Sequence, residues 1–278
     1  MIAVKAAANA ATVVKAASKK YATIIRVSFA NAIAYRANTF SRFAFYTLFI
    51  YVFMSLWQAI YKEGSVNGYS YVQMVWYLIM TELIVFSSGG MNILNSINED
   101  VKSGAIAYQL GRPVHYILLQ FTGILGQVFV NLVSFGALAA ILGHVFVGPL
   151  PTLRLAGIFA MLLSVALGLT LGMFFMALIG LSAFVFEDNF ALFLIYQKIC
   201  FMLGVFLPVE FLPPWLQPVA KSLPFSYMTW APAKIFVNYS PELCFELIPR
   251  QAAWAAAIVA ATLLYYKLVV RRLQINGG

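Results

Sequence analysis

Two ionisable side chains stand inside long apolar runs of this sequence, where a charge has chemical consequences. Glu82 lies in "YLIMTELIVF" and Lys198 lies in "LIYQKICF". A charge at membrane depth costs about 3 kcal/mol or more unless it faces protein or water. The two residues have opposite sign, so they predict either a buried ion pair between helices or a polar lining for a translocation pathway.

Motifs for nucleotide binding and covalent catalysis are absent from the sequence. There is no GxxxxGK[ST] segment, so the chain has no P-loop to hold the phosphates of ATP. HExxH and GxSxG are missing as well. His115 and His144 stand alone, and Cys200 and Cys244 lack metal-ligand spacing. We therefore expect no catalytic residue, no metal and no cofactor bound by this chain.

The composition indicates that lipid is the solvent. Hydrophobic residues make up 63% of the chain, charged residues 10%, and the mean hydropathy is +0.87, whereas soluble domains are about 25% charged. Residues 1–42 hold seven bases and no acid directly before the first apolar run. This pattern predicts a cytoplasmic N-terminus, with a cleaved transit peptide as the other interpretation. The sequence shows no further feature of nucleic-acid recognition, so nucleic acid is not an expected partner.

The apolar runs predict an all-α, polytopic membrane protein with six transmembrane helices. A basic N-terminus at 1–42, with an amphipathic interfacial helix over 18–40, precedes a permease domain at 43–270 and a tail at 271–278. Twelve of the eighteen bases fall on the predicted inner side and five on the outer side, which places both termini in the cytoplasm. The expected spans are about 43–61, 70–94, 114–147, 153–186, 190–207 and 251–270.

One compact polar segment, 96–113, separates the second and third spans. In a chain so short of charge, this segment is interpreted as a contact for another protein. A shorter polar turn between the fourth and fifth spans, with Glu187 and Asp188, is a second candidate contact. The residues of the first contact that are most suited to such a role are Glu99, Asp100, Lys102, Gly104, Arg112 and Pro113.

A proline-rich stretch, 208–224, precedes the last span. Proline cannot continue a helix because it lacks the backbone N–H and clashes with the preceding turn. The stretch therefore predicts short helical pieces that dip back into the membrane, with their freed backbone groups buried in protein; an ordinary apolar loop is the alternative. A polar loop is expected to follow, to about residue 250. The residues of this predicted hairpin are Pro208, Glu210, Pro213, Pro214, Trp215, Pro218 and Pro224.

These features, in this order, resemble the permease subunit of type-2 ATP-binding-cassette (ABC) exporters over roughly residues 20–270. "NEDVKSGAIAYQLGRPVHY" resembles the cytoplasmic coupling segment of that family, and "GVFLPVEFLPPWLQPVAKSLPF" resembles its external re-entrant hairpin. The basic N-terminus is not a required feature of the family.

The resemblance implies an exporter of two permease subunits, of the same or related chains, and two cytoplasmic ATPase subunits that hold ATP and Mg. Residues 96–113 would form a short coupling helix in a groove of the ATPase. Spans two and five would line the pathway, which places Glu82 and Lys198 beside the substrate. The membrane would be of the bacterial inner-membrane type.

Two other functions fit the same residues. An ATP-independent channel or ion-coupled carrier would use Glu82 and Lys198, although no paired broken spans or inverted repeat are visible. A membrane assembly protein that transports nothing would have no polar cavity between spans two and five.

Overall fold

The computed structural model describes residues 2–34, 39–61, 67–149, 155–186 and 188–275, and these residues contain helices and turns but no β-strand. In chain order the elements are α1 (Ile2–Ala34), α2 (Thr39–Ile60), α3 (Tyr71–Ser87), α4 (Gly90–Lys102), α5 (Ile106–Leu110), α6 (Tyr116–Phe146), α7 (Leu155–Leu181), η3 (Ser182–Phe184), α8 (Phe190–Cys200), η4 (Phe201–Val205), η5 (Val209–Phe211), α9 (Leu216–Ser222), η6 (Ser226–Met228), α10 (Trp230–Val237) and α11 (Pro241–Ile275).

Five helical stretches in the described part of the chain are long and apolar enough to cross a membrane. Each has at least 21 residues, and about 20 residues at 1.5 Å each span the ~30 Å of hydrocarbon. The predicted fifth span is shorter: the apolar helix over Phe190–Val205 falls below the length of a full span. These stretches are Phe40–Ile60, Tyr71–Lys102, Tyr116–Phe146, Leu155–Phe184 and Pro241–Arg271.

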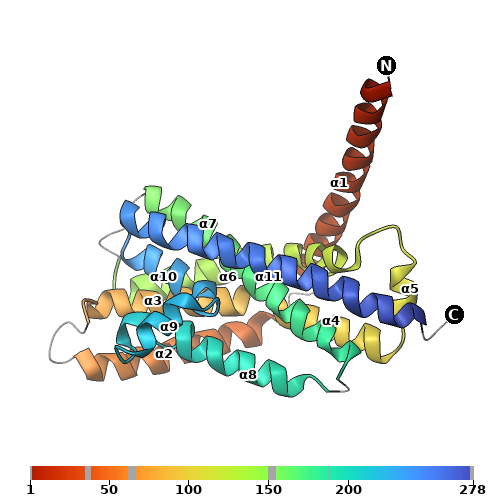
Figure 1. The fold of residues 1–278 in the computed structure, drawn as a ribbon. Coiled ribbons are helices and arrows are strands. Elements are labelled where there is room, and N and C mark those ends of the chain that lie inside the picture. The colour runs from red at the N-terminus through yellow and green to blue at the C-terminus, as the bar shows by residue number, and fades with distance from the viewer. Residues whose placement is uncertain (1, 35–38, 62–66, 150–154, 187, 276–278) are drawn as a thin grey trace.

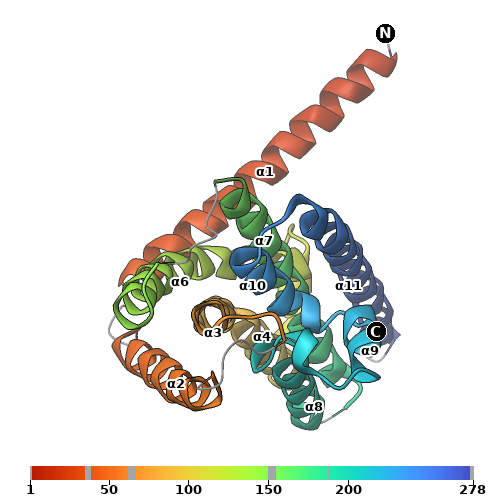
Figure 2. The same cartoon turned by 90° about the vertical axis from the view of Figure 1, so that its left-hand side faces the viewer.

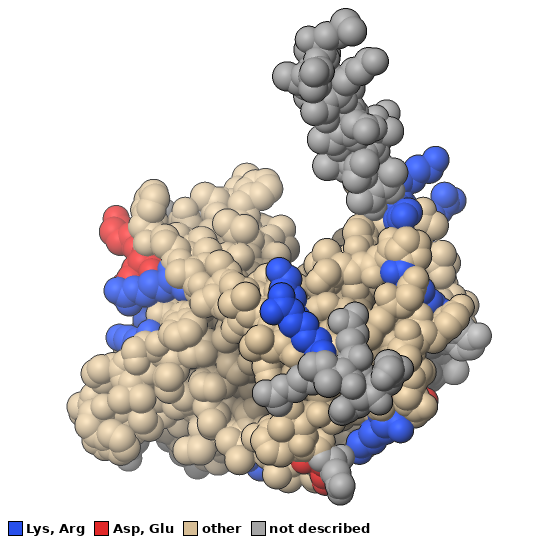
Figure 3. Space-filling view, turned by 45° about the vertical axis from the view of Figure 1, so that its right-hand side comes forward, with Lys and Arg blue, Asp and Glu red and all other residues tan. Residues whose placement is uncertain are grey.

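The long helices run side by side, and the bundle therefore has two distinct ends (Figure 1). The α5 end carries α5 and the C-terminal end of α11, whereas the α9 end carries α9, α10 and the start of α11. Lys and Arg side chains gather around the α5 end, and an uncharged surface separates them from a smaller charged group at the far edge (Figure 3). This distribution suits a bundle whose middle lies in lipid.

α3 lies at the centre of the bundle, encircled by α2, α6, α10 and α4 (Figure 2). It is apolar on all sides, and its residues from Met74 to Glu82 are all buried. A helix that is hydrophobic all round is expected inside a bundle.

The second span is divided into two helices at Ser88 and Gly89. Ser88 has an extended backbone, with ψ of 141°, and Gly89 and Gly90 follow. A Cβ on Gly89 would lie 2.3 Å from the Ile124 side chain of α6, and one on Gly90 would lie 2.8 Å from Met176 of α7. The break and the two glycines therefore let α4 pack closely against both neighbours.

α1 runs across the bundle axis near the α5 end (Figures 1 and 2). Its contact with α6 is backbone to backbone, because a Cβ on Gly126 would lie 2.2 Å from the amide nitrogen of Phe29. The rings of Phe29 and Phe129 are 6.0 Å apart at the same crossing. The helix predicted over 18–40 begins earlier in the structure, since α1 runs from Ile2 to Ala34. Residues 35–38 lie outside the described ranges.

The proline-rich stretch forms the predicted short helical pieces, η5 and α9, followed by η6 and α10. The polar loop expected to about residue 250 is wrong. α10 is buried on nearly every side against α3 and α7, and α11 begins at Pro241 instead of near 251. Polar residues such as Lys234 indicate a solvated loop when the sequence is read alone, whereas the structure places Lys234 in α10 and pairs it with Glu210.

Gln251 of α11 joins the proline-rich segment to α7. Its side-chain nitrogen donates to the carbonyl oxygens of Ser164 and Tyr227, each at 2.8 Å, and its oxygen accepts from the Ser164 hydroxyl at 2.7 Å. Gly168, one turn after Ser164, leaves room for the Met228 carbonyl, which a Cβ would approach to 2.5 Å. The segment is thereby fixed to two long helices.

Candidate functional site: the α4–α5 segment

The polar segment 96–113 is not a single short helix. Its first half is the end of α4, and the chain then turns through Gly104, whose φ is +74°. α5 follows with only five residues. α4 buries Ile93, Leu94 and Ile97 on one face, which turns the opposite face outward.

The predicted contact residues of this segment divide into an exposed group and one inward acid. Glu99, Lys102, Gly104, Arg112 and Pro113 are exposed, and the Arg112 guanidinium lies 5.0 Å from the centre of the exposed Tyr108 ring. The Asp100 carboxylate instead points into the protein. Successive helix residues are about 100° apart, so Glu99 and Asp100 face different surroundings.

Asp100 connects α4 to the start of α6. Its carboxylate accepts a hydrogen bond from the Tyr116 hydroxyl at 2.7 Å and another from the Gln120 side chain at 3.2 Å. Hydrogen bonds to a carboxylate are stronger than neutral ones. These two hydrogen bonds therefore hold the end of α4 against the first turns of α6.

A second connection joins α4 to α8 through an amide pair, Asn98 and Asn189. Each side chain donates to the other, at 3.0 and 2.8 Å, and Asn189 also donates to the Ile179 carbonyl at 2.8 Å. Sequence reasoning missed this pair. The signal available was that Asn98 follows the buried Ile97 on an otherwise apolar face.

The second predicted contact lies beside this amide pair. Asp188 is exposed, and its carboxylate accepts from the Phe190 amide at 2.8 Å at the start of α8. Glu187 lies outside the described residues. The two polar turns that the sequence singled out are therefore neighbours at the α5 end.

α1 and α11 meet the same region at His115. The His115 backbone amide donates to the Tyr21 hydroxyl at 3.3 Å, and its ring lies 5.0 Å from the ring of Tyr266. Burial and the nearby Lys267 charge both lower the pKa of His115. Four helices, α1, α4, α6 and α11, thus converge on the base of the α4–α5 segment.

The structure does not bring Glu82 and Lys198 together. Glu82 is 3% exposed within α3, whereas Lys198 is exposed on α8. No ion pair joins them or includes either one in the described part of the chain. The buried ion pair is therefore not formed, and the lining of a pathway by these residues stays a prediction.

α8 is joined to the central helix where its backbone loosens into the π-helical turn η4. The Tyr77 hydroxyl donates to the Gly204 carbonyl at 2.7 Å, and the Thr81 hydroxyl lies 3.3 Å from the Val205 carbonyl. A π turn leaves carbonyls without their usual partners, and π turns are frequent at functional sites. α3 and α8 are therefore tied to each other as well as to α4.

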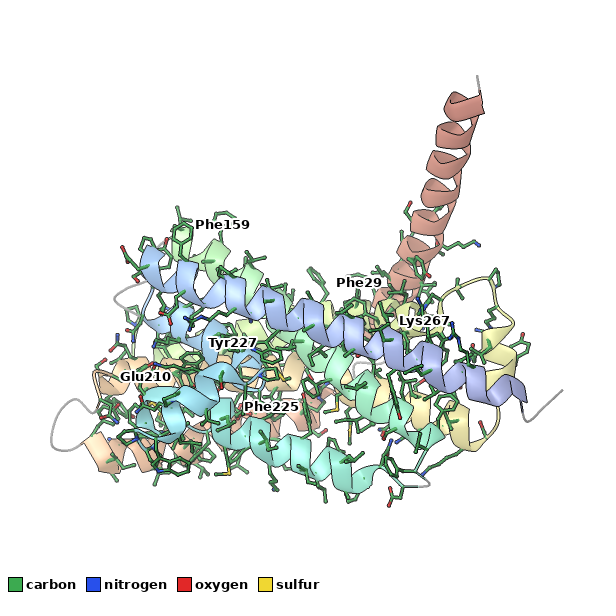
Figure 4. All side chains as sticks on the ribbon, viewed as in Figure 1. Phe29, Phe159, Glu210, Phe225, Tyr227 and Lys267 are labelled. Carbon is green, nitrogen blue, oxygen red and sulfur yellow. The ribbon has the colours of Figure 1, made fainter. Side chains whose placement is uncertain are left out.

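The predicted hairpin contains a partly buried acid, Glu210, at the α9 end (Figure 4). Glu210 pairs with Lys234 of α10 and accepts from the Tyr69 hydroxyl at 3.1 Å and from the Trp230 indole at 3.2 Å. Pro208 and Pro224 are buried, whereas Pro213, Pro214, Trp215 and Pro218 are exposed. The polar contacts of Glu210 thus hold the proline-rich stretch to α10 and to Tyr69.

Acid should destabilise this cluster. Burial raises the pKa of Glu210, but Lys234 and the indole hydrogen bond outweigh burial and bring the pKa below its ordinary value. Such an acid stabilises the fold above its unfolded pKa of about 4.3, and this stabilisation is lost as the pH falls through the folded pKa. We expect the melting temperature in detergent to fall below about pH 4.5, less steeply for Glu210→Gln. Glu242→Gln, an exposed acid, is the control; equal profiles for all three proteins would contradict this.

The described residues include no group of three His, Cys, Asp or Glu side chains that could hold a metal ion. The candidate site is an exposed polar segment at one end of the helix bundle, held by hydrogen bonds to α6 and α8. A family model described as "ABC-2 family transporter protein" matches residues 20–277, and comparison with curated proteins gives no match. The chain therefore belongs to the ABC-2 family of transporter proteins, as a membrane-embedded permease subunit.

Proposed function

We propose that this permease exports its substrate, with the power supplied by ATP hydrolysis on a separate cytoplasmic ATPase subunit that holds ATP and Mg. Membership of the family implies an ATP-binding-cassette partner. The observation that carries the proposal is the α4–α5 segment: Glu99, Lys102 and Arg112 are exposed there, while its inner face is fastened to α6 and α8.

The ATPase would act on this segment as on a lever. Closure of the ATPase around ATP displaces α4, the Asp100 contacts pass the displacement to α6, and the amide pair passes it to α8. The hydrogen bonds of Tyr77 and Thr81 then pass a movement of α8 to α3. Because packed helices shift between discrete arrangements, this route can change which side of the pathway is open.

The α5 end faces the cytoplasm in this proposal, and both termini lie there. The end of α11 lies at the α5 end (Figure 1), and Lys and Arg side chains gather there on the face that Figure 3 shows, as the positive-inside rule leads us to expect. The hairpin at the α9 end then faces outward. α1, which crosses the bundle beside the same end, would lie along the inner membrane surface.

A second permease subunit is part of the proposal. Lys198 and Gln197 are exposed near the middle of the α8 run, where contact with lipid would be costly. A second copy or a related chain facing α8 would enclose a wet pathway between the two subunits and give Lys198 water or substrate as its neighbour.

Co-purification with a tag on the full chain tests the proposal. From native membranes, we expect a companion chain with a P-loop, identified by mass spectrometry, and ATP hydrolysis by the isolated complex. Glu99→Lys should lower recovery of the companion by about tenfold, because an exposed interface charge is reversed and like charges at an interface cost several kcal/mol.

Glu242→Lys provides the matched control, since Glu242 is also an exposed acid but lies at the start of α11 at the opposite end. Recovery should then equal that of the unaltered chain. Loss of the companion in Glu242→Lys but not in Glu99→Lys would place the ATPase at the α9 end. The absence of any P-loop companion, together with transport that needs no nucleotide, would overturn the proposal.

A further inference from the structure

A groove of about 580 Å³ lies between the hairpin and α11. Lys221 and Ser222 at the end of α9 form one wall, and Arg250, Ala253, Trp254 and Ala257 of α11 form the other. This volume falls within the range of about 300–1,000 Å³ that ligand pockets have. None of the predicted contact or pathway residues lines it.

The groove is divided into a cationic rim and an apolar floor. Arg250 is the last base before the apolar run 251–266, and Lys267 ends that run. Trp254 and Ala257 lie one and two turns deeper along the same face of α11, so they enter the apolar layer where Arg250 remains at its edge. Tryptophan is typical of this boundary.

The charges of the rim leave capacity for an anion. Arg250 donates to Glu246 at 3.0 Å in a pair whose side chains are about half exposed, and a guanidinium keeps further donors after such a contact. The Lys221 ammonium has no acceptor among the described residues. Only the backbone carbonyl of Lys221 is engaged there, and it accepts a hydrogen bond from the Tyr227 hydroxyl. Two cations against one carboxylate give the rim a net positive charge.

We propose that this groove binds an anionic phospholipid of the leaflet at the α9 end. The phosphate lies between Lys221 and Arg250, and an acyl chain follows Trp254 and Ala257 into the membrane. Cations at a membrane boundary contribute about fivefold each to the binding of anionic lipid. A soluble phosphate would use the rim but leave the apolar floor empty.

Titration of the delipidated full chain with lipid, followed by native mass spectrometry, tests the proposal. We expect dioleoyl phosphatidylglycerol to bind about tenfold more tightly than dioleoyl phosphatidylcholine, and glycerol phosphate not to compete. Lys221→Gln with Arg250→Gln should remove this preference. Glu246→Gln should strengthen binding by about twofold or more, because it releases Arg250 from its only acid partner in the described residues.

Two further variants keep the result interpretable if the double variant is poorly folded. Ala257→Leu fills the floor and should weaken binding of both lipids, whereas Lys102→Gln removes an exposed cation from the polar segment outside the membrane and should change nothing. Equal binding of the two lipids, wild-type binding by the double variant, weaker binding by Glu246→Gln, or competition by glycerol phosphate would each overturn the proposal. The lipid site does not depend on the ATPase partner, so its failure leaves the proposed export function untouched.

Discussion

Replacing Asn98 with leucine is expected to uncouple nucleotide binding from movement of the permease. The substitution removes two hydrogen bonds between α4 and α8, each worth about 1 kcal/mol. A coupling energy of this size corresponds to about tenfold or more in the population of the moved state. ATP hydrolysis by the companion ATPase should stay within about twofold, because Asn98 is directed at Asn189 and away from the exposed face.

Distances between spin labels measure this effect without knowledge of the substrate. With Cys200 and Cys244 replaced by serine, labels at Ile60 and Ser222 report on the α9 end, and a label at Lys102 reports on the segment itself. In the unaltered complex, ATP with vanadate should shift the distance distribution between the labels at Ile60 and Ser222, and also the distribution measured from the label at Lys102. Asn98→Leu should retain the shift at Lys102 and lose most of the shift at the α9 end.

Asn95→Leu is the matched control for this experiment, because Asn95 is exposed on the same helix about one turn earlier. It should behave like the unaltered chain. If both leucine variants retain the full shift at the α9 end, the amide pair does not transmit the movement. If Asn98→Leu also abolishes the shift at Lys102, the residue acts on ATPase binding instead.

Replacing Glu210 with alanine is expected to give the largest loss of stability. Lys234 would keep its charge in a mostly buried position, and Tyr69 and Trp230 would lose their acceptor. Removing one partner of a buried ion pair costs about 3–5 kcal/mol. The two side chains retain 18% and 21% of their exposure, so we expect the low end, about 3 kcal/mol. A fall of roughly 6–12 °C in the melting temperature should follow.

A double-mutant cycle separates the ion pair from the rest of the cluster. The double variant, Glu210→Leu with Lys234→Met, should recover more than half of the stability that Glu210→Leu alone loses, because no unpaired charge remains. Recovery should be incomplete, since the Tyr69 hydroxyl and the Trp230 indole still lack an acceptor. Glu246→Ala, which breaks an exposed pair of half-exposed side chains, should change the melting temperature by less than about 2 °C. Additive losses for the two single variants would show that the pair contributes no coupling.

The role of the predicted contact segment stays a prediction, and the structure adds how its residues are arranged. The polar segment 96–113 and the turn at Asp188 lie together at one end of the bundle, next to the amide pair. Glu99 and Asp100 are neighbouring acids in the sequence, and nothing in the sequence indicates that Glu99 faces outward while Asp100 accepts a hydrogen bond from Tyr116. That difference depends on which face of α4 is buried, and this is set by the contacts of Gly89 and Gly90 with α6 and α7.

Errors in the predicted fold came where polar residues were read as solvated. Lys234 was expected in a polar loop, yet it pairs with Glu210 of the proline-rich stretch. The two residues are 24 positions apart, and no local pattern encodes their contact. The short fifth span also depends on distant partners, because the Phe190–Val205 helix ends in a π turn whose carbonyl oxygens accept hydrogen bonds from Tyr77 and Thr81 of α3.

By itself, the sequence determined that this chain is helical, that lipid surrounds it, and where its prolines and its one charged segment interrupt the helices. Those properties follow from local composition and from the backbone chemistry of proline, which act within a few residues. The tertiary structure alone decided that Glu82 and Lys198 stand apart, that Asn98 meets Asn189, and that Glu210 finds Lys234. Each of these depends on how whole helices pack, because burial and hydrogen bonding are settled between segments that only the fold brings into contact.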